Sequence, residues 1–497
     1  MRIADTPVDE RGIIDKECSN MAVARLVFLS GDEQDLIHES SLKSLKEIGM
    51  LIRSDVTLQM LSDSGADVDF SKMIAKIPEE MVNEALSKAP RNIRLCARDS
   101  KHDMEIPVSG PPFVATSGLG VYIRDMDTGE KKPSTRKDIA DFIRLGDGLD
   151  GVDFLWTSIT ANEVPPISHG LHELWTAMQN TTKHVNGVSV MGAADSRKQV
   201  ELGALIAGSE DELRKRPLFS VICCSIAPLS YEGGAVEGMV ELVRAGIPIM
   251  SMSMSLPGGS SPVTMAGTIS NANTENLASL VITQFAAPGS PHIYCSSSAP
   301  ISMRTGVINY MVPEHCIIAA GLGQMARRYG LPSMVGEWGI NDKEAPGIPQ
   351  SFSEVMGVAL SSMGNSDLIS GIGGIDAVKG VSYEQAVIES HIWEHVRGFM
   401  RRFEISDETI ALDVVKQVGH GNSFLSHVHT ARNFKKELFF FDEKKKDWER
   451  TYSDAMVPEA KEIAKRILRE HEVPSLDGDM KRQGDEIIAA YEKSLGV

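Results

Sequence analysis

The sequence predicts an α/β protein, a (β/α)8 TIM barrel flanked by N-terminal and C-terminal extensions that are mainly helical. An apolar, strand-like run followed by a helix-length segment recurs eight times between Pro112 and Met400. The runs lack clean polar alternation, which is typical of parallel strands buried on both faces. The rival, an open doubly wound sheet, usually shows a glycine-rich nucleotide turn after an early strand. The first two strands have no such turn, which favours the barrel.

Each predicted strand is rich in Val, Ile, Leu or Met, and eight such units are enough to close a barrel. The strands are, in order, Pro112–Thr116, Val152–Trp156, His184–Val190, Leu218–Ser225, Ile247–Ser253, His292–Ser297, Ser333–Gly336 and Asp367–Gly371.

The segments between and after the strands carry helix-start residues and periodic apolar faces, as a barrel's outer helices require. They are Thr135–Gly148, Ser168–Asn180, Ser196–Ala207, Glu232–Ala245, Thr264–Ala286, Pro313–Tyr329, Gln350–Met363 and Ser382–Arg402.

The chain is predicted to have three parts. Residues 1–110 form a helical or mixed extension, residues 111–404 form the barrel with the active site, and residues 405–497 form a helical extension. The helices predicted in the extensions are Asp32–Met50, Ser54–Ser64, Pro78–Ala89, Asp407–Val418 and an amphipathic end from Glu459 to Leu495.

Composition excludes several classes of protein. With 50 basic and 68 acidic residues, the net charge of −18 argues against nucleic-acid and anionic-membrane partners. The six cysteines show no CxxC pattern, so we expect no disulfide framework and a reduced, cytoplasmic setting. No run approaches the roughly 20 apolar residues that cross a bilayer, so we expect no membrane association.

Barrel enzymes place their chemistry at the carboxyl ends of the strands. In this chain those ends offer no zinc spacing, no GxSxG elbow and no Walker loop. The one HxH pattern, His427-Val428-His429, lies beyond the barrel without a third ligand in view, so we predict no metal site.

The strand ends offer aromatic rings and methionine instead. Aromatic faces hold quaternary ammonium groups through the ring quadrupole. Trp338, Trp156, Tyr294 and Met252 are therefore candidate substrate-binding residues, with ordinary core packing as the alternative for each ring.

Two further features lie near strand ends. The guanidinium of Arg304, just beyond the sixth strand, suits a carboxylate, or else a structural ion pair. The turn Gly371–Gly374 suits a phosphate nest, or a tight turn that lets a partner or cofactor approach the backbone.

Several motifs, taken together and in order, resemble the trimethylamine methyltransferase superfamily. They are Asp127-Thr128-Gly129-Glu130, Arg144-Leu145-Gly146-Asp147, Pro262-Val263-Thr264-Met265-Ala266-Gly267, Pro288-Gly289-Ser290-Pro291, Met303-Arg304-Thr305-Gly306 and Gly373-Gly374-Ile375-Asp376. The resemblance implies a barrel enzyme that transfers a methyl group from an amine to the cobalt of a separate corrinoid protein. It implies that this chain binds no cofactor tightly and that the corrinoid is carried by the partner.

The sequence departs from the family pattern at two places. Founding members carry pyrrolysine, which this sequence lacks, and the end of the seventh strand reads Gly336-Glu337-Trp338-Gly339. A run that resembles Asp-Ser-Lys in many relatives is Asn341-Asp342-Lys343-Glu344 here. Both departures argue against a tertiary amine substrate and leave the roles of Glu337, Asp342 and Lys343 open.

A quaternary ammonium leaves as a neutral amine and needs only positioning and desolvation, whereas a tertiary amine must first be activated. We therefore predict demethylation of a quaternary amine, with glycine betaine favoured and dimethylglycine released. Carnitine, choline or proline betaine are the nearest alternatives. A lyase using Lys343 and Asp342, and a non-catalytic betaine-binding protein, are alternatives of other classes.

For a betaine substrate, we expect Arg304, or less favourably His315 or His184, to anchor the carboxylate, and we expect Glu337 to lie beside the substrate. Gly371, Gly373, Gly374 and Tyr383 would face the corrinoid. We also expect a homo-oligomer.

Overall fold

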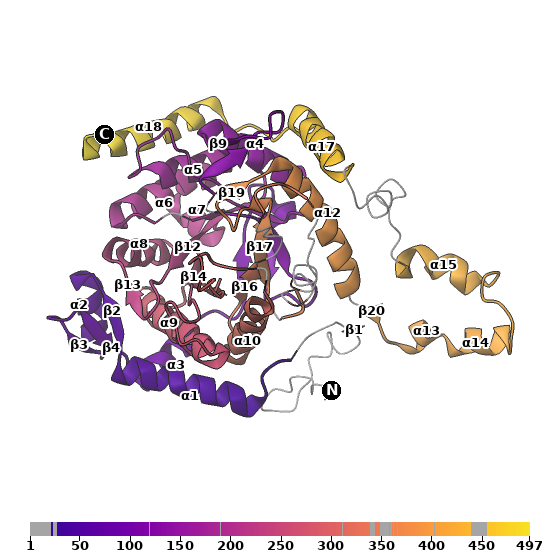
Figure 1. Cartoon of the computed structure of the whole chain (residues 1–497), viewed down its shortest axis with the longest axis horizontal. Coiled ribbons are helices and arrows are strands. Elements are labelled where there is room, and N and C mark those ends of the chain that lie inside the picture. Colours follow the sequence, from indigo (N-terminus) through magenta and orange to yellow (C-terminus); the bar gives the residue numbers. More distant parts are fainter. Residues whose placement is uncertain are drawn as a thin grey trace.

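The computed structural model describes residues 21–22, 27–118, 120–188, 190–310, 312–337, 343–347, 357, 360, 362–364, 366–401, 403–438 and 455–497. At its centre eight parallel strands close into a barrel (Figure 1). Their order around the barrel is β7 (Phe113–Thr116), β10 (Phe154–Trp156), β11 (His184–Gly187), β12 (Phe219–Cys224), β14 (Ile249–Ser253), β15 (His292–Ser296), β16 (Ser333–Glu337) and β17 (Leu368–Ile372). The predicted (β/α)8 fold and all eight predicted strands are confirmed.

Helices ring the barrel at the positions that the sequence predicts. They are α4 (Arg136–Asp147), α5 (His169–Gln179), α6 (Ala193–Ala207), α8 (Gly233–Arg244), α9 (Met265–Ala286), α10 (Pro313–Tyr329) and α12 (Tyr383–Met400), with the short α7 (Glu210–Lys215) before β12. The predicted helix Gln350–Met363 falls mostly outside the described residues. No helix within the described ranges combines the length and apolar character needed to cross a membrane.

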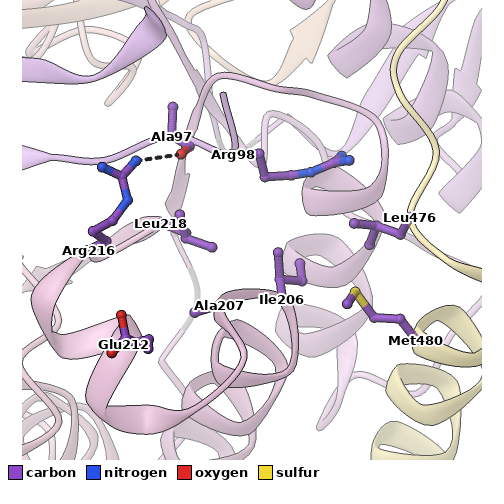
Figure 2. A pocket seen from close by; sticks show the side chains of 9 residues that line it. All are labelled: Ala97, Arg98, Ile206, Ala207, Glu212, Arg216, Leu218, Leu476 and Met480. Atoms are coloured by element: carbon purple, nitrogen blue, oxygen red, sulfur yellow. Dashed lines mark hydrogen bonds between the residues drawn. The ribbon is translucent and has the colours of Figure 1, made fainter. Parts of the chain in front are cut away.

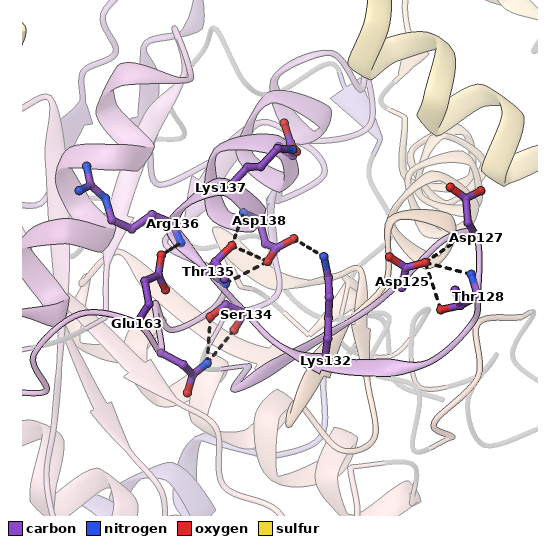
Figure 3. Close-up of polar contacts among 12 residues, drawn as sticks. Asp125, Asp127, Thr128, Lys132, Ser134, Thr135, Arg136, Lys137, Asp138 and Glu163 are labelled. Carbon is purple, nitrogen blue, oxygen red and sulfur yellow. Dashed lines mark hydrogen bonds and ion pairs between the residues drawn. The ribbon is translucent and has the colours of Figure 1, made fainter.

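The first barrel helix shows how the sequence fixes an element boundary. Thr135 caps α4, and its hydroxyl and backbone N–H both bond the Asp138 carboxylate, which completes a capping box (Figure 3). Lys132 pairs with the same carboxylate at 3.0 Å. These contacts hold the loop after β7 against the start of α4.

That loop folds into a hairpin of β8 (Tyr122–Arg124) and β9 (Lys131–Pro133). Asp125 Oδ1 accepts hydrogen bonds from the backbone N–H groups of Asp127 and Thr128, so the Asp127–Glu130 motif is the hairpin turn (Figure 3). With β18 (Gly374–Ile375) and β19 (Gly380–Val381), the hairpin forms a four-stranded sheet. This sheet lies beside the carboxyl ends of β7 and β17, from which its segments emerge.

A second hairpin closes the opposite, amino end of the barrel. It pairs β5 (Ile93–Leu95) with β6 (Met104–Ile106), which flank a 3-10 turn at Ser100–His102. The apolar side chains of this hairpin join the same hydrophobic cluster as the inward-facing residues of the barrel strands. The hairpin therefore fills the amino end of the barrel, so a site inside the barrel would open at the carboxyl end.

The N-terminal extension packs on the outside of the barrel. Its helices α1 (Gly31–Glu47) and α3 (Glu79–Lys88) lie against α9, and α2 (Asp55–Asp63) lies beside them. The three predicted helices are present. The extension also holds β2 (Met50–Ile52), β3 (Asp67–Asp69) and β4 (Ile74–Lys76), which the sequence did not predict and which join β13 (Ser230–Tyr231) in one sheet.

The C-terminal part is divided in two. After β20 (Phe403–Glu404), which pairs with β1 (Met21–Ala22), the helices α13 (Asp407–Ile410), α14 (Leu412–Val418) and α15 (Val428–Glu437) project away from the barrel (Figure 1). We call residues Phe403–Leu438 the arm. The chain then returns to the barrel as α17 (Met456–Glu470), which packs on α12, and α18 (Gly478–Leu495), which packs on α6. The predicted amphipathic end is thus two helices, separated by a segment that contains Pro474.

The last helix docks through a glycine. A Cβ at Gly484 would lie 2.1 Å from Cζ2 of the fully buried Trp175. Gly484→Ala is expected to detach α18 from α5 at a cost of about 1–3 kcal/mol, because the buried ring cannot yield. Limited proteolysis would detect faster cleavage of the C-terminal helix. Gly478→Ala in the same helix meets no atom within 4 Å and is the matched control; equal cleavage rates in the two variants would contradict the prediction.

Candidate active site at the carboxyl end of the barrel

The interior of the barrel is lined by sulfur, aromatic and aliphatic groups. Trp156 and Met252, both predicted substrate-binding residues, lie together in this lining with exposed fractions of 3% and 4%. Each stands at or near the carboxyl end of its strand. The Trp156 ring lies against Gly118, where a Cβ would be 2.1 Å from ring atom Cε3. The other apolar residues of the lining are Ala115, Phe154, Ile222, Met250, Ile293, Cys295, Met334 and Leu368.

A chain of hydrogen bonds fixes the orientation of Asn186, the neighbour of Trp156 in register on β11. Burial lowers the pKa of His184 to about 4, so its ring is neutral and carries one N–H. His184 Nδ1 lies 2.7 Å from the carbonyl oxygen of Cys96, which only accepts, and therefore donates to it. His184 Nε2 then accepts from Ser220 Oγ at 2.9 Å, and Ser220 Oγ accepts from Asn186 Nδ2 at 2.7 Å.

Two buried polar atoms at and beside Asn186 have no hydrogen-bond partner among the described residues. They are Asn186 Oδ1 and Trp156 Nε1. A buried polar atom without a partner costs about 1–3 kcal/mol, and native proteins keep few of them. One is a pure donor and the other a pure acceptor, on adjacent strands inside the barrel. Asn186 is not among the site residues that the sequence predicts, because a lone Asn within an apolar strand gives no signal of its own.

Tyr294 does not share this lining. In β15 the residues Ile293 and Cys295 face the barrel interior, whereas Tyr294 lies in the layer between strands and helices. Its hydroxyl donates to Asn273 Oδ1 of α9 at 2.9 Å. The predicted role of Tyr294 in a substrate cage is therefore corrected: its side chain ties the barrel wall to α9.

The predicted carboxylate anchors are separated. Arg304 is exposed in the loop after β15. His315 is 2% exposed, and its Nδ1 lies 3.0 Å from the carbonyl oxygen of Ser298. Burial lowers the pKa of His315, so the ring is neutral and cannot pair with a carboxylate as a cation. His184 is neutral for the same reason, which leaves Arg304 as the cationic candidate of the three.

The residues predicted to face the corrinoid are buried. A Cβ at Gly373, whose φ is +88°, would lie 2.6 Å from the Phe142 ring of α4. A Cβ at Gly374 would lie 2.6 Å from Ser117 Oγ. Gly371 is buried in β17, and Tyr383 packs against Phe142 with ring centroids 5.8 Å apart. Side chains of the protein itself pack against these residues, and their predicted place facing the corrinoid stays a prediction.

Trp338 and Asp342, which the sequence analysis singled out, lie outside the described residues. Glu337 ends β16 and pairs in register with Ser370, but nothing is described of its side chain. Lys343 is exposed, and its carbonyl oxygen accepts from the backbone of Asp376. Within the described ranges no three His, Cys, Asp or Glu side chains gather to hold a metal, and His427 bonds Gln417 instead.

The rim of the barrel mouth holds an unusual backbone turn. Asp376, Ala377 and Val378 have φ values of +54°, +50° and +67°, a left-handed stretch that costs about 1–2 kcal/mol per residue. The Asp376 carboxylate is held by Tyr122 Oη at 3.1 Å and Lys131 Nζ at 3.2 Å, both from the β8–β9 hairpin. The turn faces the loop after β15 across a cavity of about 200 Å³. Its lining is Ser302, Thr305, Val307, Ile308, Asn309, Asp376, Ala377 and Lys379.

A larger cavity of about 350 Å³ lies at the amino end, where α6 ends and β12 begins (Figure 2). Arg216 donates to the carbonyl oxygen of Ala97 at its edge, and the C-terminal residues Leu476 and Met480 form its far wall. This position, away from the carboxyl ends of the strands, separates the cavity from the candidate active site.

A buried carboxyl group follows β11 at the start of α6. Burial raises the pKa of Asp195 to about 6, although Gln199 Nε2 donates to it at 2.9 Å. Since the folded state holds a proton between about pH 4 and pH 6 that the unfolded state has lost, the free energy of unfolding should fall as pH rises through this window. The fall should reach about 2–3 kcal/mol and then level off above pH 6.

Urea unfolding at several pH values checks this expectation. Asp195→Asn, which keeps the shape of the side chain, should flatten the fall between pH 4 and pH 6. An identical pH dependence in the two proteins would contradict the assignment.

Comparison with known proteins identifies the family. Residues 11–496 match the family model described as trimethylamine methyltransferase (MTTB). Trimethylamine methyltransferase MttB of Desulfitobacterium hafniense (strain DSM 10664 / DCB-2) is 33% identical over 405 residues, which cover 82% of this chain and 81% of that protein. Glycine betaine methyltransferase of Desulfitobacterium hafniense (strain Y51) is 26% identical over 478 residues, 94% of this chain and 98% of that protein.

A solved structure, the monomethylamine methyltransferase MtmB of Methanosarcina barkeri, aligns with a TM-score of 0.48 at 12% identity. The alignment covers 89% of this chain and 93% of that one. The family resemblance read from the sequence motifs is confirmed by the match along almost the whole chain. The chain belongs to the trimethylamine methyltransferase (MTTB) family and is an enzyme of the methyltransferase class.

Proposed function

We propose that the enzyme takes a methyl group from a quaternary amine, glycine betaine first, and passes it to Co(I) of a separate corrinoid protein, releasing dimethylglycine. The observation that carries the proposal is the lining around Trp156 and Met252. Its apolar members present thioether, thiol, aromatic and aliphatic groups, and the polar side chains described beside them, His184, Ser220 and Asn186, are uncharged. Such a lining suits a donor that needs neither protonation nor deprotonation.

The chemistry of the leaving group explains this fit. As the methyl carbon bonds to its acceptor, the electron pair of the C–N bond goes to nitrogen, and a quaternary amine leaves as a neutral tertiary amine. The corrinoid supplies the nucleophilic Co(I). An aromatic face restrains the cation without a full negative charge, which would stabilise the ground state more than a transition state that is losing positive charge. Trp156 and Met252 would position and desolvate the ammonium head.

The buried polar atoms without a partner among the described residues, Trp156 Nε1 and Asn186 Oδ1, would hydrogen-bond the polar part of the substrate. Trp156 Nε1–H would donate to a carboxylate oxygen of glycine betaine. Arg304, in the loop after β15, is the cation that would pair with the same carboxylate. The name of the 26%-identical relative, glycine betaine methyltransferase, supports the same substrate.

Asn186 favours a second candidate, a quaternary amine that carries a hydroxyl group, such as choline or carnitine. Its Oδ1 accepts only, as the hydrogen-bond chain from Cys96 shows, and a hydroxyl both donates to Asn186 and accepts from Trp156. A site built for a hydroxyl discriminates strongly against an analogue without one.

The test follows the cobalt spectrum anaerobically. The purified enzyme is mixed with a Co(I) corrinoid protein and with glycine betaine, choline, carnitine, proline betaine or trimethylamine, one at a time. Loss of the Co(I) spectrum with glycine betaine but not trimethylamine is expected, and turnover of choline or carnitine in its place would select the second candidate. Turnover of trimethylamine alone would overturn the quaternary preference, and binding of a betaine without any turnover would point to a non-catalytic binding protein.

A further inference from the structure

Asn186 carries an amide whose orientation is decided by the side chains behind it. Asn186 is fully buried on β11, and its register partners in the barrel wall are Trp156 on β10 and Ser220 on β12. Residues in register on neighbouring parallel strands face the same side of the sheet. Asn186 and Ser220 therefore point toward the barrel interior, to whose lining Trp156 belongs.

The direction of each hydrogen bond behind Asn186 follows from one backbone group. The carbonyl oxygen of Cys96, just after β5, can only accept, so the neutral His184 ring carries its proton on Nδ1. His184 Nε2 is then a bare acceptor, and Ser220 Oγ, 2.9 Å away, gives it its only proton. Ser220 Oγ can now only accept, and it accepts from Asn186 Nδ2 at 2.7 Å. The amide of Asn186 therefore turns its nitrogen toward Ser220.

The second proton on Asn186 Nδ2 has a partner as well. It faces the sulfur of Met250 on β14 at 3.2 Å, and a thioether sulfur only accepts. The remaining polar atom of the amide is Oδ1, which is buried and has no hydrogen-bond partner among the described residues. A reversed amide would set Oδ1 against Ser220 Oγ and Met250 Sδ, neither of which has a proton to give. Only the present orientation avoids a contact between two acceptors.

This arrangement gives the two unpartnered polar atoms of the barrel opposite characters. Trp156 Nε1–H only donates, and Asn186 Oδ1 only accepts. A substrate carboxylate, which also only accepts, can bond Trp156 but is repelled beside Asn186, whereas a hydroxyl can bond either atom. The chain of bonds that starts at Cys96 thus selects the polar group that can lie next to Asn186.

We propose that Ser220 is a positioning residue for substrate selection: it holds Asn186 with the carbonyl oxygen toward the substrate and so excludes a carboxylate oxygen from that place. Ser220 acts through Asn186 and needs no contact with the substrate. The inference rests on the proposed function, since it takes a quaternary amine inside the barrel as the ligand. It adds a determinant of the polar tail, which the chemistry of methyl transfer does not fix.

Isothermal titration calorimetry on the full chain tests the proposal without a corrinoid protein. Glycine betaine and choline are the probes, because they share a trimethylammonium head and differ in a carboxylate against a hydroxyl. The measured quantity is the Kd for glycine betaine divided by the Kd for choline. Ser220→Ala removes the acceptor of Asn186 Nδ2, so the amide can turn and donate to a carboxylate. The ratio should fall by about 10-fold or more, the effect of one hydrogen bond to a charged group.

A double-mutant cycle shows whether Ser220 acts through Asn186. Asn186→Leu removes the amide, so adding Ser220→Ala to it should leave the ratio of the two Kd values unchanged. Ser220→Thr keeps the hydroxyl and should keep the wild-type ratio. The matched control is Ser251→Ala: Ser251 is a buried serine of β14 in register with Tyr294, on the helix side of the barrel wall, and its loss should not change the ratio.

Ser220→Cys guards against a folding defect, because its thiol is only a weak donor and a weak acceptor. It should shift the ratio in the same direction as Ser220→Ala, while thermal unfolding by circular dichroism stays cooperative in both variants. An unchanged ratio in these two variants, or an equal shift when Ser220→Ala is added to Asn186→Leu, would overturn the proposal and leave the proposed function standing. A wild type that binds no quaternary amine would overturn the proposed function, and this inference with it.

Discussion

Trp156→Phe is expected to lower kcat/KM for the carboxylate-bearing substrate by about 10- to 100-fold, because a hydrogen bond to a charged group contributes about 1.5–3 kcal/mol. The change removes the buried N–H that has no partner among the described residues, and it keeps an aromatic face in the barrel. Since that N–H bonds none of the side chains or backbone groups that the structure describes, the free energy of unfolding should change by less than about 2 kcal/mol, mostly from the smaller ring. Steady-state kinetics with corrinoid protein and urea unfolding measure the two effects.

The same substitution elsewhere provides the control. Trp175 is also fully buried, but its Nε1 donates to Asp485 at 3.0 Å and so joins α5 to α18. Trp175→Phe should lower stability and leave kcat/KM close to that of the wild type. If Trp156→Phe retained full activity, Trp156 would be core packing and the substrate would lie elsewhere.

Asp367→Ala should lower the free energy of unfolding by about 3–5 kcal/mol, because it removes a fully buried carboxylate that accepts from two backbone N–H groups and from a half-buried guanidinium. Asp367 is fully buried just before β17. Its carboxylate accepts from the backbone of Val108 at 2.9 Å and of Ser333 at 2.8 Å, and from Arg327 at 3.0 Å. These partners belong to the segment after the β5–β6 hairpin, to β16 and to α10, so the loss should destabilise the whole barrel.

Urea unfolding monitored by tryptophan fluorescence measures the loss. Asp69→Ala, which removes a solvent-exposed ion pair with Lys72, is the control and should leave the midpoint unchanged. Asp367→Asn, which keeps one acceptor oxygen, should lie between the wild type and the alanine variant. A shift as small as that of Asp69→Ala would show that the network around Asp367 is dispensable.

The barrel could be predicted from the sequence because its strands are buried on both faces and therefore read as continuous apolar runs. The same property hides which side each residue faces. In the run Ile293-Tyr294-Cys295 all three residues are fully buried, so no polar alternation tells that Tyr294 points at α9 and its neighbours point into the barrel. The error about Tyr294 follows from this ambiguity.

The β5–β6 hairpin was missed because each strand has three residues with only two buried. A segment this short gives no periodic signal that stands out from a loop. Its importance comes from long-range packing under the barrel, which no local pattern reports.

Gly373 shows a second limit of prediction from the sequence, which concerns the neighbours of a glycine. The sequence indicates correctly that Gly373 requires an unusual backbone, since its φ is +88°. It does not indicate which group comes close, and the structure shows that Phe142 of α4 does. The acceptor role of Asn186 depends on Cys96 and Ser220, which are far apart in the chain, and so it emerges only from the fold.

The plug at the amino end of the barrel has a kinetic consequence for the proposed reaction. With β5 and β6 filling one end, the small substrate, the corrinoid and the demethylated product all have to use the carboxyl end. A corrinoid protein that docks first at the carboxyl end would cover the route of the substrate at that end. Steady-state measurements should therefore show an ordered sequence in which the amine binds before the corrinoid protein, with inhibition at high corrinoid protein concentration that added amine relieves.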